Sequence, residues 1–568
     1  MTYGKRFIAS GVIVALTLLM KYHTFFSGYE QIAGFRGSDL QEEIWNPLIA
    51  SSVNNNLLSV VIDNKQYTNE EYSFFMDDNL SVMMPVNILR DALNCSAHVY
   101  DGNRLLVEKH AEELEFMTEE HTVRVNGERK EIVSPLTERD GQYYVSLNDL
   151  AAYLDYTYTW DMQENRALAS DNSVSTTIVP VKYDLREKGR TAEVRDQGNY
   201  GTCWSCAALG AMESVLLPEE QAQYSVDHMT LSNDFRLDQH EGGDYTMGMA
   251  YLAAWRGPVC EEDDPYGDDR TVEGLEPVKH VQEMQIIDGK DYEKIKEAVF
   301  KYGGVQTSVY NALRSSHTQS PYFNKATNSY CYIGTEKPNH DVVIIGWDDS
   351  YSKDNFSVDL EGDGAFICQN SWGKSFGENG VFYISYYDTN IGTHNVVYTG
   401  IEDAGNYDNI YQSDLCGWRG QLGYHSESMY GANVFTAAGR ENIAAASFYA
   451  TGRDSQYELY VVRQFENEKS FENRIPVASG KLSNAGYYTV KFNQEIPVEP
   501  GERFAIVLYI ITPNSARPMA VEYAADEEAD YVNLEDGESY ISFNGTEWTD
   551  VDLVEKANLC IKAFSNQQ

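Results

Sequence analysis

The stretch QGNYGTCWSCAA, residues 197–208, decides how the central part of the chain folds and works. Cys203 and Cys206 form a CxxC pair of the kind that carries out dithiol redox chemistry, but the same stretch could instead present one nucleophilic thiolate. The redox alternative requires the first cysteine to follow a parallel strand in a compact βαβ unit. Residues 181–201 are charged and rich in turn-forming residues, and they contain no apolar run for a central strand. The sequence therefore favours a single nucleophile.

The residues after this stretch predict a helix. AALGAMESVLL, residues 207–217, has apolar residues at helical spacing, so Cys203 is expected at a helix start, where the helix dipole favours a thiolate. Cys206 comes one turn later, on the side of Leu209 and Gly210, where a cysteine usually acts as a small hydrophobic residue. We expect Cys203 to be the reactive cysteine.

A cysteine nucleophile also needs a base and a third group that fixes the ring of that base. NHDVVIIGWDD, residues 339–349, places His340 at the entrance to a continuous apolar strand. AFICQNSWG, residues 365–373, places Asn370 directly after a second strand. Both residues are far downstream of the cysteine, as is usual for such sites. The sequence therefore predicts a Cys–His–Asn site.

Together these segments resemble the papain family of cysteine peptidases. QGNYGTCW is similar to the glutamine-to-cysteine segment of that family, with the same six-residue step from Gln197 to Cys203. NHDVVIIGW is similar to its histidine strand, and NSWG followed by GENGVFYI is similar to its asparagine region. The resemblance covers residues from roughly 180 to 395. It implies a two-lobed peptidase, with a helical lobe and a β-barrel-like lobe, over residues 181–400.

The resemblance implies a role for each of these residues. Cys203 would be a thiolate paired with protonated His340 and would attack the scissile carbonyl to form a thioester. Gln197 and the backbone N–H of Cys203 would stabilise the oxyanion. Asn370 would accept a hydrogen bond from His340, and Trp372 would shield that bond from water. The expected activity is that of an endopeptidase, a hydrolase that requires no cofactor.

The same resemblance implies where substrate binds. Gly242 and Gly243 would offer backbone to an extended substrate, because a residue without Cβ allows another chain to approach closely. Asp244, Tyr245 and Pro338 would line the pocket for the residue before the cut. No metal ligand is expected among these residues.

The chain also departs from the family pattern. An acidic segment, residues 348–364, separates the histidine strand from the asparagine strand. It is either a solvated loop, a cation site, for which calcium is the candidate, or a rim that repels acidic substrates. The usual helical inhibitory propeptide is not evident before residue 180, where a duplicated module stands instead.

An internal repeat identifies that module, residues 58–170. MPVNILRDALNCSAHVYDGNRLL, from Met84, matches VSLNDLAAYLDYTYTWDMQENRAL, from Val145. Each copy predicts a short strand, a helix and a second strand, so the module is a duplicated α+β structure. It resembles the copper amine oxidase N-terminal-like domains, yet His98, His110 and His121 show no metal-ligand spacing and are expected to be solvated.

Residues 405–568 consist of short alternating strands separated by Gly, Pro, Asn and Asp, which is typical of a β-sandwich. This segment resembles the lectin-like domains that accompany papain-type peptidases on clostridial cell-surface proteins. The resemblance makes cell-wall carbohydrate a candidate ligand, and the acidic loops make calcium a second one.

The chain is expected to leave the cytoplasm. Residues 1–26 have the basic start and apolar run of a signal peptide or an N-terminal membrane anchor, residues 27–57 form a tether, and residues 171–180 form a linker. The formal net charge of −44 repels nucleic acid and anionic lipid. The expected location is the extracellular space or surface of a Gram-positive bacterium, with any membrane contact made only through the N-terminal segment.

These observations favour a multidomain α+β protein, an extracellular cysteine endopeptidase that acts on surface or environmental proteins or peptides. The alternative is a cell-surface or carbohydrate-binding protein in which the peptidase fold is a non-catalytic scaffold. The presence of Gln197, Cys203, His340 and Asn370 argues against the scaffold.

Overall fold

The computed structural model describes most of the chain after residue 57. The predicted signal peptide or anchor (1–26), the tether (27–57) and most of the linker (171–180) lie outside the described residues. Among the described residues, no helix combines the length and apolar character that crossing a membrane would require. The described ranges are 58–62, 65–68, 72–109, 112–161, 166–171, 179–313, 320–525, 532–534, 538–551 and 555–568.

The chain divides into two compact units, residues 1–76 with 157–170 and residues 77–156 with 171–568. The strands of the first unit form a four-stranded sheet in the order β12-β13-β1-β2. The two repeats contain the helices α4 and α5, each directly after a short strand, β4 or β11, and these two strands pair antiparallel. The predicted helical faces are buried at Leu89 and Leu150. The bounds are β1 (Ser59–Ile62), β2 (Lys65–Thr68), β4 (Val82–Pro85), α4 (Val86–Leu93), β11 (Gln142–Ser146), α5 (Leu147–Tyr153), β12 (Tyr156–Asp161) and β13 (Arg166–Asp171).

A five-stranded antiparallel sheet follows α4, and its first two strands overlap the first repeat. His98 on its first strand is buried and contacts the carboxylate of Glu219, so the expectation that His98 is solvated was wrong. Its sequence context gave no sign of this distant carboxylate. His110 lies outside the described residues. The strands are β5 (Ser96–Tyr100), β6 (Arg104–Lys109), β7 (Glu112–Met117), β8 (Thr122–Val125) and β9 (Glu128–Glu131).

The helical side of the peptidase segment consists of three helices, α6 (Cys203–Leu216), α7 (Val226–Leu231) and α8 (Tyr245–Ala253). Helix α6 is buried on almost every side, because small residues such as Ala207, Ala208 and Ala211 let neighbouring elements approach closely. The side chains of Ser225 and Asp244 accept backbone N–H groups at the starts of α7 and α8. These caps fix where the two shorter helices begin.

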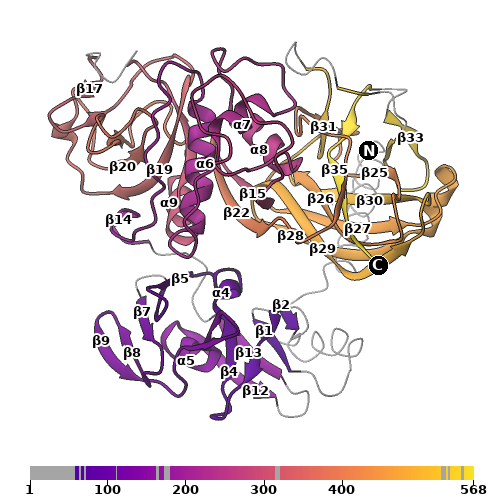
Figure 1. The fold of residues 1–568 in the computed structure, drawn as a ribbon, viewed down its shortest axis with the longest axis horizontal. Helices are drawn as coiled ribbons and strands as arrows, with labels where there is room; N and C mark the ends of the chain where they lie inside the picture. Colours follow the sequence, from indigo (N-terminus) through magenta and orange to yellow (C-terminus); the bar gives the residue numbers. More distant parts are fainter. Residues whose placement is uncertain are drawn as a thin grey trace, which may run out of the picture. The chain divides into compact units, whose positions relative to one another are not determined.

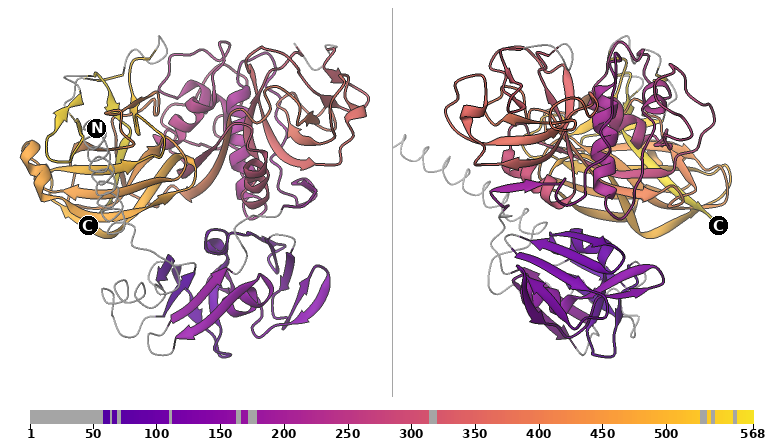
Figure 2. Two further views of the ribbon diagram at one scale, coloured as in Figure 1. Left: turned by 180° about the vertical axis from the view of Figure 1, so that it is seen from behind. Right: turned by 60° about the vertical axis from the view of Figure 1, so that its left-hand side comes forward.

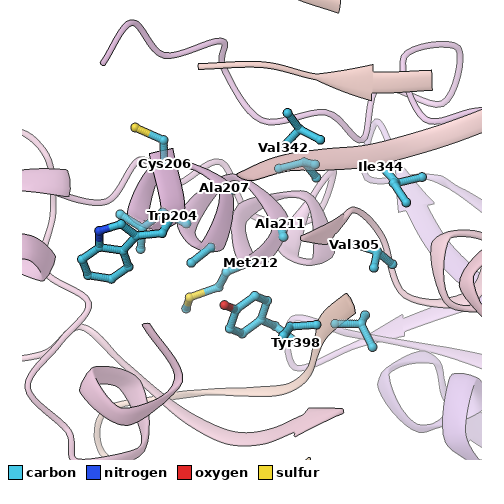
Figure 3. Packing of buried hydrophobic residues seen from close by; sticks show 14 of the residues in the cluster. Trp204, Cys206, Ala207, Ala211, Met212, Val305, Val342, Ile344 and Tyr398 are labelled. Carbon is cyan, nitrogen blue, oxygen red and sulfur yellow. The ribbon is translucent and has the colours of Figure 1, made fainter. Parts of the chain in front are cut away.

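Helix α6 packs against the strands of the other lobe, as Figures 1 and 3 show. The strands follow the order β21-β20-β19-β16-β22-β15, and β19 is buried over eight of its nine residues. Met212 of α6 and Tyr398 of β22 point toward one another in the core (Figure 3). The bounds are β14 (Lys182–Asp184), β15 (Lys279–Ile287), α9 (Tyr292–Lys301), β16 (Val305–Val309), β17 (Phe323–Asn324), β18 (Ser329–Tyr330), β19 (His340–Asp348), β20 (Ala365–Gln369), β21 (Val381–Ser385) and β22 (Asn395–Asp403).

The C-terminal segment is a β-sandwich, as the sequence predicts. One sheet has the order β28-β27-β30-β25-β32-β33, and it packs on strands that include β29, β26, β31 and β35 around an apolar core. The bounds are β23 (Asn409–Tyr411), β24 (Gly420–Leu422), β25 (Ser428–Thr436), β26 (Glu441–Ala450), β27 (Ser455–Val462), β28 (Ile475–Leu482), β29 (Ala485–Val498), β30 (Arg503–Ile511), β31 (Met519–Glu522), β32 (Ser539–Ser542), β33 (Thr549–Asp550), β34 (Asn558–Leu559) and β35 (Ile561–Gln567).

The β-sandwich and the peptidase segment share one continuous sheet. Strand β15 pairs on one side with β22 and on the other side with β29, with Met284 opposite Tyr487 and Ile286 opposite Ala485. The left view of Figure 2 shows orange strands of the β-sandwich beside salmon strands of the peptidase segment. Backbone hydrogen bonds therefore fix the position of the β-sandwich beside the peptidase segment.

Candidate active site

Cys203 is the first residue of α6 and is partly exposed. No side chain caps this helix, so the backbone N–H groups of its first turn, including that of Cys203, are available to a ligand. Cys206 lies further inside the protein and is only 5% exposed. All eight cysteines of the chain are free thiols. The two cysteines of the CxxC stretch therefore differ in environment and are not joined, which is what a single nucleophile requires.

His340 begins β19, and its ring is held by Asn370, the residue after β20. The distance from His340 Nε2 to Asn370 Oδ1 is 2.8 Å. The same oxygen accepts the backbone N–H of Ser371, also at 2.8 Å, so this atom must be an acceptor. His340 Nε2 therefore carries a proton and donates it, which leaves Nδ1 as the basic nitrogen. The Trp372 ring lies 5.2 Å from the His340 ring, centroid to centroid, and covers this pair.

Gln197 is fixed by two hydrogen bonds of its side chain. Ser371 Oγ donates to Gln197 Oε1 at 2.6 Å, and Gln197 Nε2 donates to the carbonyl of Tyr200 at 2.7 Å. A primary amide has two N–H groups, so Gln197 retains one donor for a substrate oxygen. The role of Ser371 was missed in the sequence, although this residue stands inside the NSWG motif. Neither the spacing nor the composition of that motif reveals which side chain Ser371 contacts.

Burial shifts the pKa values of Cys203 and His340 toward their neutral forms. Burial, and secondly the carboxylate of Asp341, raise the pKa of Cys203 to about 12, while backbone N–H groups of Asp341 and Trp204 act in the opposite direction. Burial lowers the pKa of His340 to about 4, against the hydrogen bond to Asn370. The expected thiolate–imidazolium pair stays a prediction.

Asp341 is a further ionisable residue at this site that sequence reasoning overlooked. It is 7% exposed, and its Oδ2 accepts a hydrogen bond from Gln306 Nε2 at 2.8 Å. Gln306 is itself held by the Tyr398 hydroxyl. Burial raises the pKa of Asp341 to about 6, and the charge of Asp244 adds to the shift. The carboxylate was visible in the NHDVV motif, but which face of the strand it occupies was not.

The two glycines predicted to bind substrate lie against the cysteine segment. A Cβ added to Gly243 would lie 2.4 Å from Trp204 Nε1, so no larger residue fits there without displacing the indole. Gly242 has a φ of +98° and packs against Gly201. These contacts place residues 242–243 beside Cys203, where an extended substrate would pass.

Asp244, Tyr245 and Pro338 are predicted to line the pocket for the substrate residue before the cut, and each lies in a different environment. Asp244 is exposed and caps α8 through Thr246, and the Tyr245 ring lies 5.4 Å from the ring of His394. Burial, and secondly the charges of Asp244 and Asp341, raise the pKa of Tyr245. Pro338 is partly exposed in the loop before β19, and only its connection to His340 places it near the site.

The acidic segment 348–364 uses several carboxylates in contacts of its own. Asp349 accepts hydrogen bonds from Lys296 at 2.7 Å and from the Tyr386 hydroxyl at 2.6 Å, and Asp348 pairs with Lys182. Within the described ranges, no group of three or more His, Cys, Asp or Glu side chains is placed to hold a metal ion. The calcium prediction thus stays a prediction without a described site.

Three protein families match successive parts of the chain. The papain family of cysteine proteases matches residues 179–401, the lectin-like domain matches residues 410–565, and the copper amine oxidase N-terminal domain matches residues 61–169. The viral cathepsin of Heliothis zea nuclear polyhedrosis virus is 27% identical over 240 residues, 40% of this chain and 58% of that protein. Cathepsin L of Sarcophaga peregrina is 26% identical over 214 residues, again with 58% of its length covered.

Two solved structures resemble a larger part of the chain. The clostridial cysteine protease Cwp84 after propeptide cleavage has a TM-score of 0.60 and 27% identity, covering 68% of this chain and 99% of that one. The cysteine protease and lectin-like domains of Cwp84, a surface layer associated protein of Clostridium difficile, give a TM-score of 0.59 and 27% identity, covering 70% and 91%. The chain therefore carries a papain family cysteine protease domain, with a copper amine oxidase N-terminal domain before it and a lectin-like domain after it.

Proposed function

We propose that the chain is a cysteine endopeptidase that hydrolyses peptide bonds through Cys203, His340, Asn370 and Gln197. The observation that carries the proposal is the shared acceptor at Asn370 Oδ1, which fixes the proton of His340 on Nε2 and leaves Nδ1 free as a base. The backbone N–H of Asp341, the residue after His340, hydrogen-bonds the Cys203 thiol, which supports the proximity of Cys203 and His340 that this role requires.

Burial shifts both groups toward their neutral forms, which supports a mechanism in which the thiol loses its proton as substrate binds. Cys203 Sγ transfers its proton to His340 Nδ1 as it attacks the scissile carbonyl carbon, and the carbonyl electrons move to the oxygen. His340 then returns the proton to the leaving amine, which leaves a thioester on Cys203. Water, deprotonated by His340 Nδ1, hydrolyses the thioester and releases the acid. Asn370 keeps the imidazole aligned in both steps.

The oxyanion is stabilised by donors that are positioned in advance. The free N–H of Gln197 Nε2 and the backbone N–H of Cys203 supply two such donors, each typically worth about 3 kcal/mol in the transition state. Because Ser371 and the Tyr200 carbonyl hold the amide of Gln197, little reorganisation is needed when the oxyanion forms.

The substrates proposed are proteins or peptides outside the cell. Cwp84 is described as surface-layer associated, and the lectin-like domain after residue 410 supports a surface location for this chain as well. Tethering by residues 1–26, and binding of cell-wall carbohydrate or calcium by the lectin-like domain, remain predictions from the sequence. The proposed domain bounds are 58–170, 181–400 and 405–568.

The experiment is covalent trapping of the full chain with a peptidyl epoxide, followed by peptide mass spectrometry. An adduct on Cys203 in the wild type and in Cys206→Ala, together with cleavage of a denatured protein substrate by both, supports the proposal. Cys203→Ala is the matched negative control. If the wild type forms no adduct and cleaves nothing while it remains folded, the chain is a binding protein on a peptidase scaffold.

A further inference from the structure

A cavity of about 180 Å³ lies where helix α8 meets the lectin-like domain. The peptidase side contributes residues from α8 and β15, and the lectin-like side contributes two aromatic residues. The lining residues are Tyr245, Thr246, Met249, Ile286, Trp418 and Tyr449. Because the cavity needs residues of both domains, a peptidase domain alone would not form it.

The lining is mostly apolar. Trp418 and Tyr449 place their rings 6.0 Å apart, and with Met249 and Ile286 they present mostly carbon to the cavity. Tyr449 is 3% exposed, yet its hydroxyl has no hydrogen-bond partner among the described residues. This hydroxyl is itself buried and lies near Asp414, Cys560 and Glu522, so Tyr449 contributes its ring and not its hydroxyl to the cavity. The volume suits one large side chain, since apolar pockets are filled in this way in complexes.

The walls of the cavity are held rigidly. Ile286 lies opposite Ala485 where β15 pairs with β29, and Tyr449 lies opposite Tyr487 where β29 pairs with β26. The lining residues of the two domains thus belong to one hydrogen-bonded sheet. A cavity in such a frame persists in the absence of a ligand, which reduces the entropy lost on binding.

The cavity begins close to the reactive sulfur along the predicted path of the substrate. Gly243 packs directly on Trp204, the residue after Cys203, and Tyr245 follows Gly243 by two positions. A substrate that runs along Gly243 advances about 3.3 Å per residue. Its third to fifth residues before the cut therefore come within reach of the cavity, beyond the pocket formed next to Asp244.

We infer that this cavity binds a large apolar side chain, aromatic or leucine-like, of an extended protein substrate, at the third to fifth position before the scissile bond. The inference rests on the proposed peptidase function and adds a substrate class to it. The lectin-like domain would then take part directly in substrate selection.

The test uses the full chain and two sets of fluorogenic peptides. Short substrates have two residues before the cut, and long substrates have six, with Ala or Phe placed in turn at the third, fourth and fifth positions before the cut. Burial of a phenylalanine side chain predicts that Phe at one of these positions raises kcat/KM by roughly 10- to 100-fold over Ala, whereas short substrates are cleaved at a rate that does not depend on the cavity.

Two cavity variants and one control sharpen the measurement. Trp418→Ala should abolish most of the preference for Phe while cleavage of the short substrate persists. Ile286→Phe, which fills part of the cavity, should shift the preference toward smaller side chains and serves if Trp418→Ala does not fold. Phe543→Ala is the control, because Phe543 is an exposed aromatic residue of the same domain outside the cavity.

The outcomes separate the two proposals. If the wild type cleaves short substrates but shows no preference at any of the three positions, the cavity inference is refuted and the peptidase function stands. If N-acetylglucosamine oligomers block long substrates without any side-chain preference, the cavity is a sugar site and the inference is likewise wrong. If the wild type cleaves neither set, the peptidase function itself fails.

Discussion

Replacing Ser371 by alanine tests the idea that this residue positions the oxyanion donor. Ser371 Oγ donates to Gln197 Oε1 at 2.6 Å, and both side chains are buried. Gln197 Nε2 would keep its second hydrogen bond, 2.7 Å to the Tyr200 carbonyl, so the amide would be loosened but not released. The full contribution of the Gln197 donor is about 3 kcal/mol, and one neutral hydrogen bond contributes about 1 kcal/mol net.

From these values we expect Ser371→Ala to lower kcat roughly fivefold to tenfold, which corresponds to about 1.0–1.4 kcal/mol in the activation free energy. KM should change little, because the oxyanion forms only in the transition state. The free energy of unfolding should fall by about 1–2 kcal/mol, because a buried acceptor loses its donor. The assay is steady-state hydrolysis of one peptide, with urea unfolding as the separate measure of stability.

A double-mutant cycle decides whether Ser371 acts through Gln197. Gln197→Ala alone should slow kcat by roughly 100-fold, and adding Ser371→Ala should then have almost no further effect. Ser371→Thr, which keeps the hydroxyl, should retain most of the activity. If the two substitutions multiply their effects on kcat, Ser371 does not work by holding the Gln197 amide, and the reasoning is refuted.

Three further predictions concern charge, space and a buried ion pair. Asp341→Asn should lower the pKa of the Cys203 thiol, seen as faster alkylation by iodoacetamide near pH 8 than in wild type; equal rates would show that the carboxylate does not influence the sulfur. Burial raises the pKa of Asp341 from 3.8 to about 6, so the unfolded chain releases this proton at a lower pH than the folded chain does. The free energy of unfolding therefore falls as the pH rises between these two values. In thermal melts, Asp341→Asn should raise the free energy of unfolding by up to about 3 kcal/mol at pH 8 and change it little at pH 4. Gly243→Ala should lower kcat/KM at least tenfold, because the added Cβ displaces the Trp204 indole. Gly501→Ala is the control and should leave kcat/KM at the wild-type value, because Gly501 has a positive φ but open space around it. Arg195→Met should lower the free energy of unfolding by about 3–5 kcal/mol, because it leaves the buried Glu213 unpaired. Arg440→Met, at an exposed ion pair, should lower it by about 0.5 kcal/mol or less. Similar values for the two substitutions would contradict the role of burial.

The residues of the candidate site could be named from the sequence because each stands at a recognisable junction. Cys203 begins a helix, His340 begins a buried strand and Asn370 follows another, and such element boundaries are encoded by neighbouring residues. The repeat gave the two helices α4 and α5 in the same way. Local pattern was enough wherever a residue's place depended on its immediate neighbours.

The remaining features depend on residues that are distant in the chain. The pairing of β15 with β29 joins strands about 200 residues apart, and strand alternation does not specify which partner a strand takes. The shifted pKa values of Cys203 and His340 follow from burial by residues that are distant in the sequence. The contact of Ser371 with Gln197 likewise appears only once two loops have met.

The pairing of β15 with β29 also bears on what happens if the chain is shortened. Cutting it after residue 401 would remove β29 and leave one edge of β15 with its N–H and C=O groups unpaired. An open edge of this kind is a template for another copy of the same strand, so the trimmed peptidase should self-associate or precipitate. The lectin-like domain therefore protects the peptidase from aggregation, whatever ligand it binds.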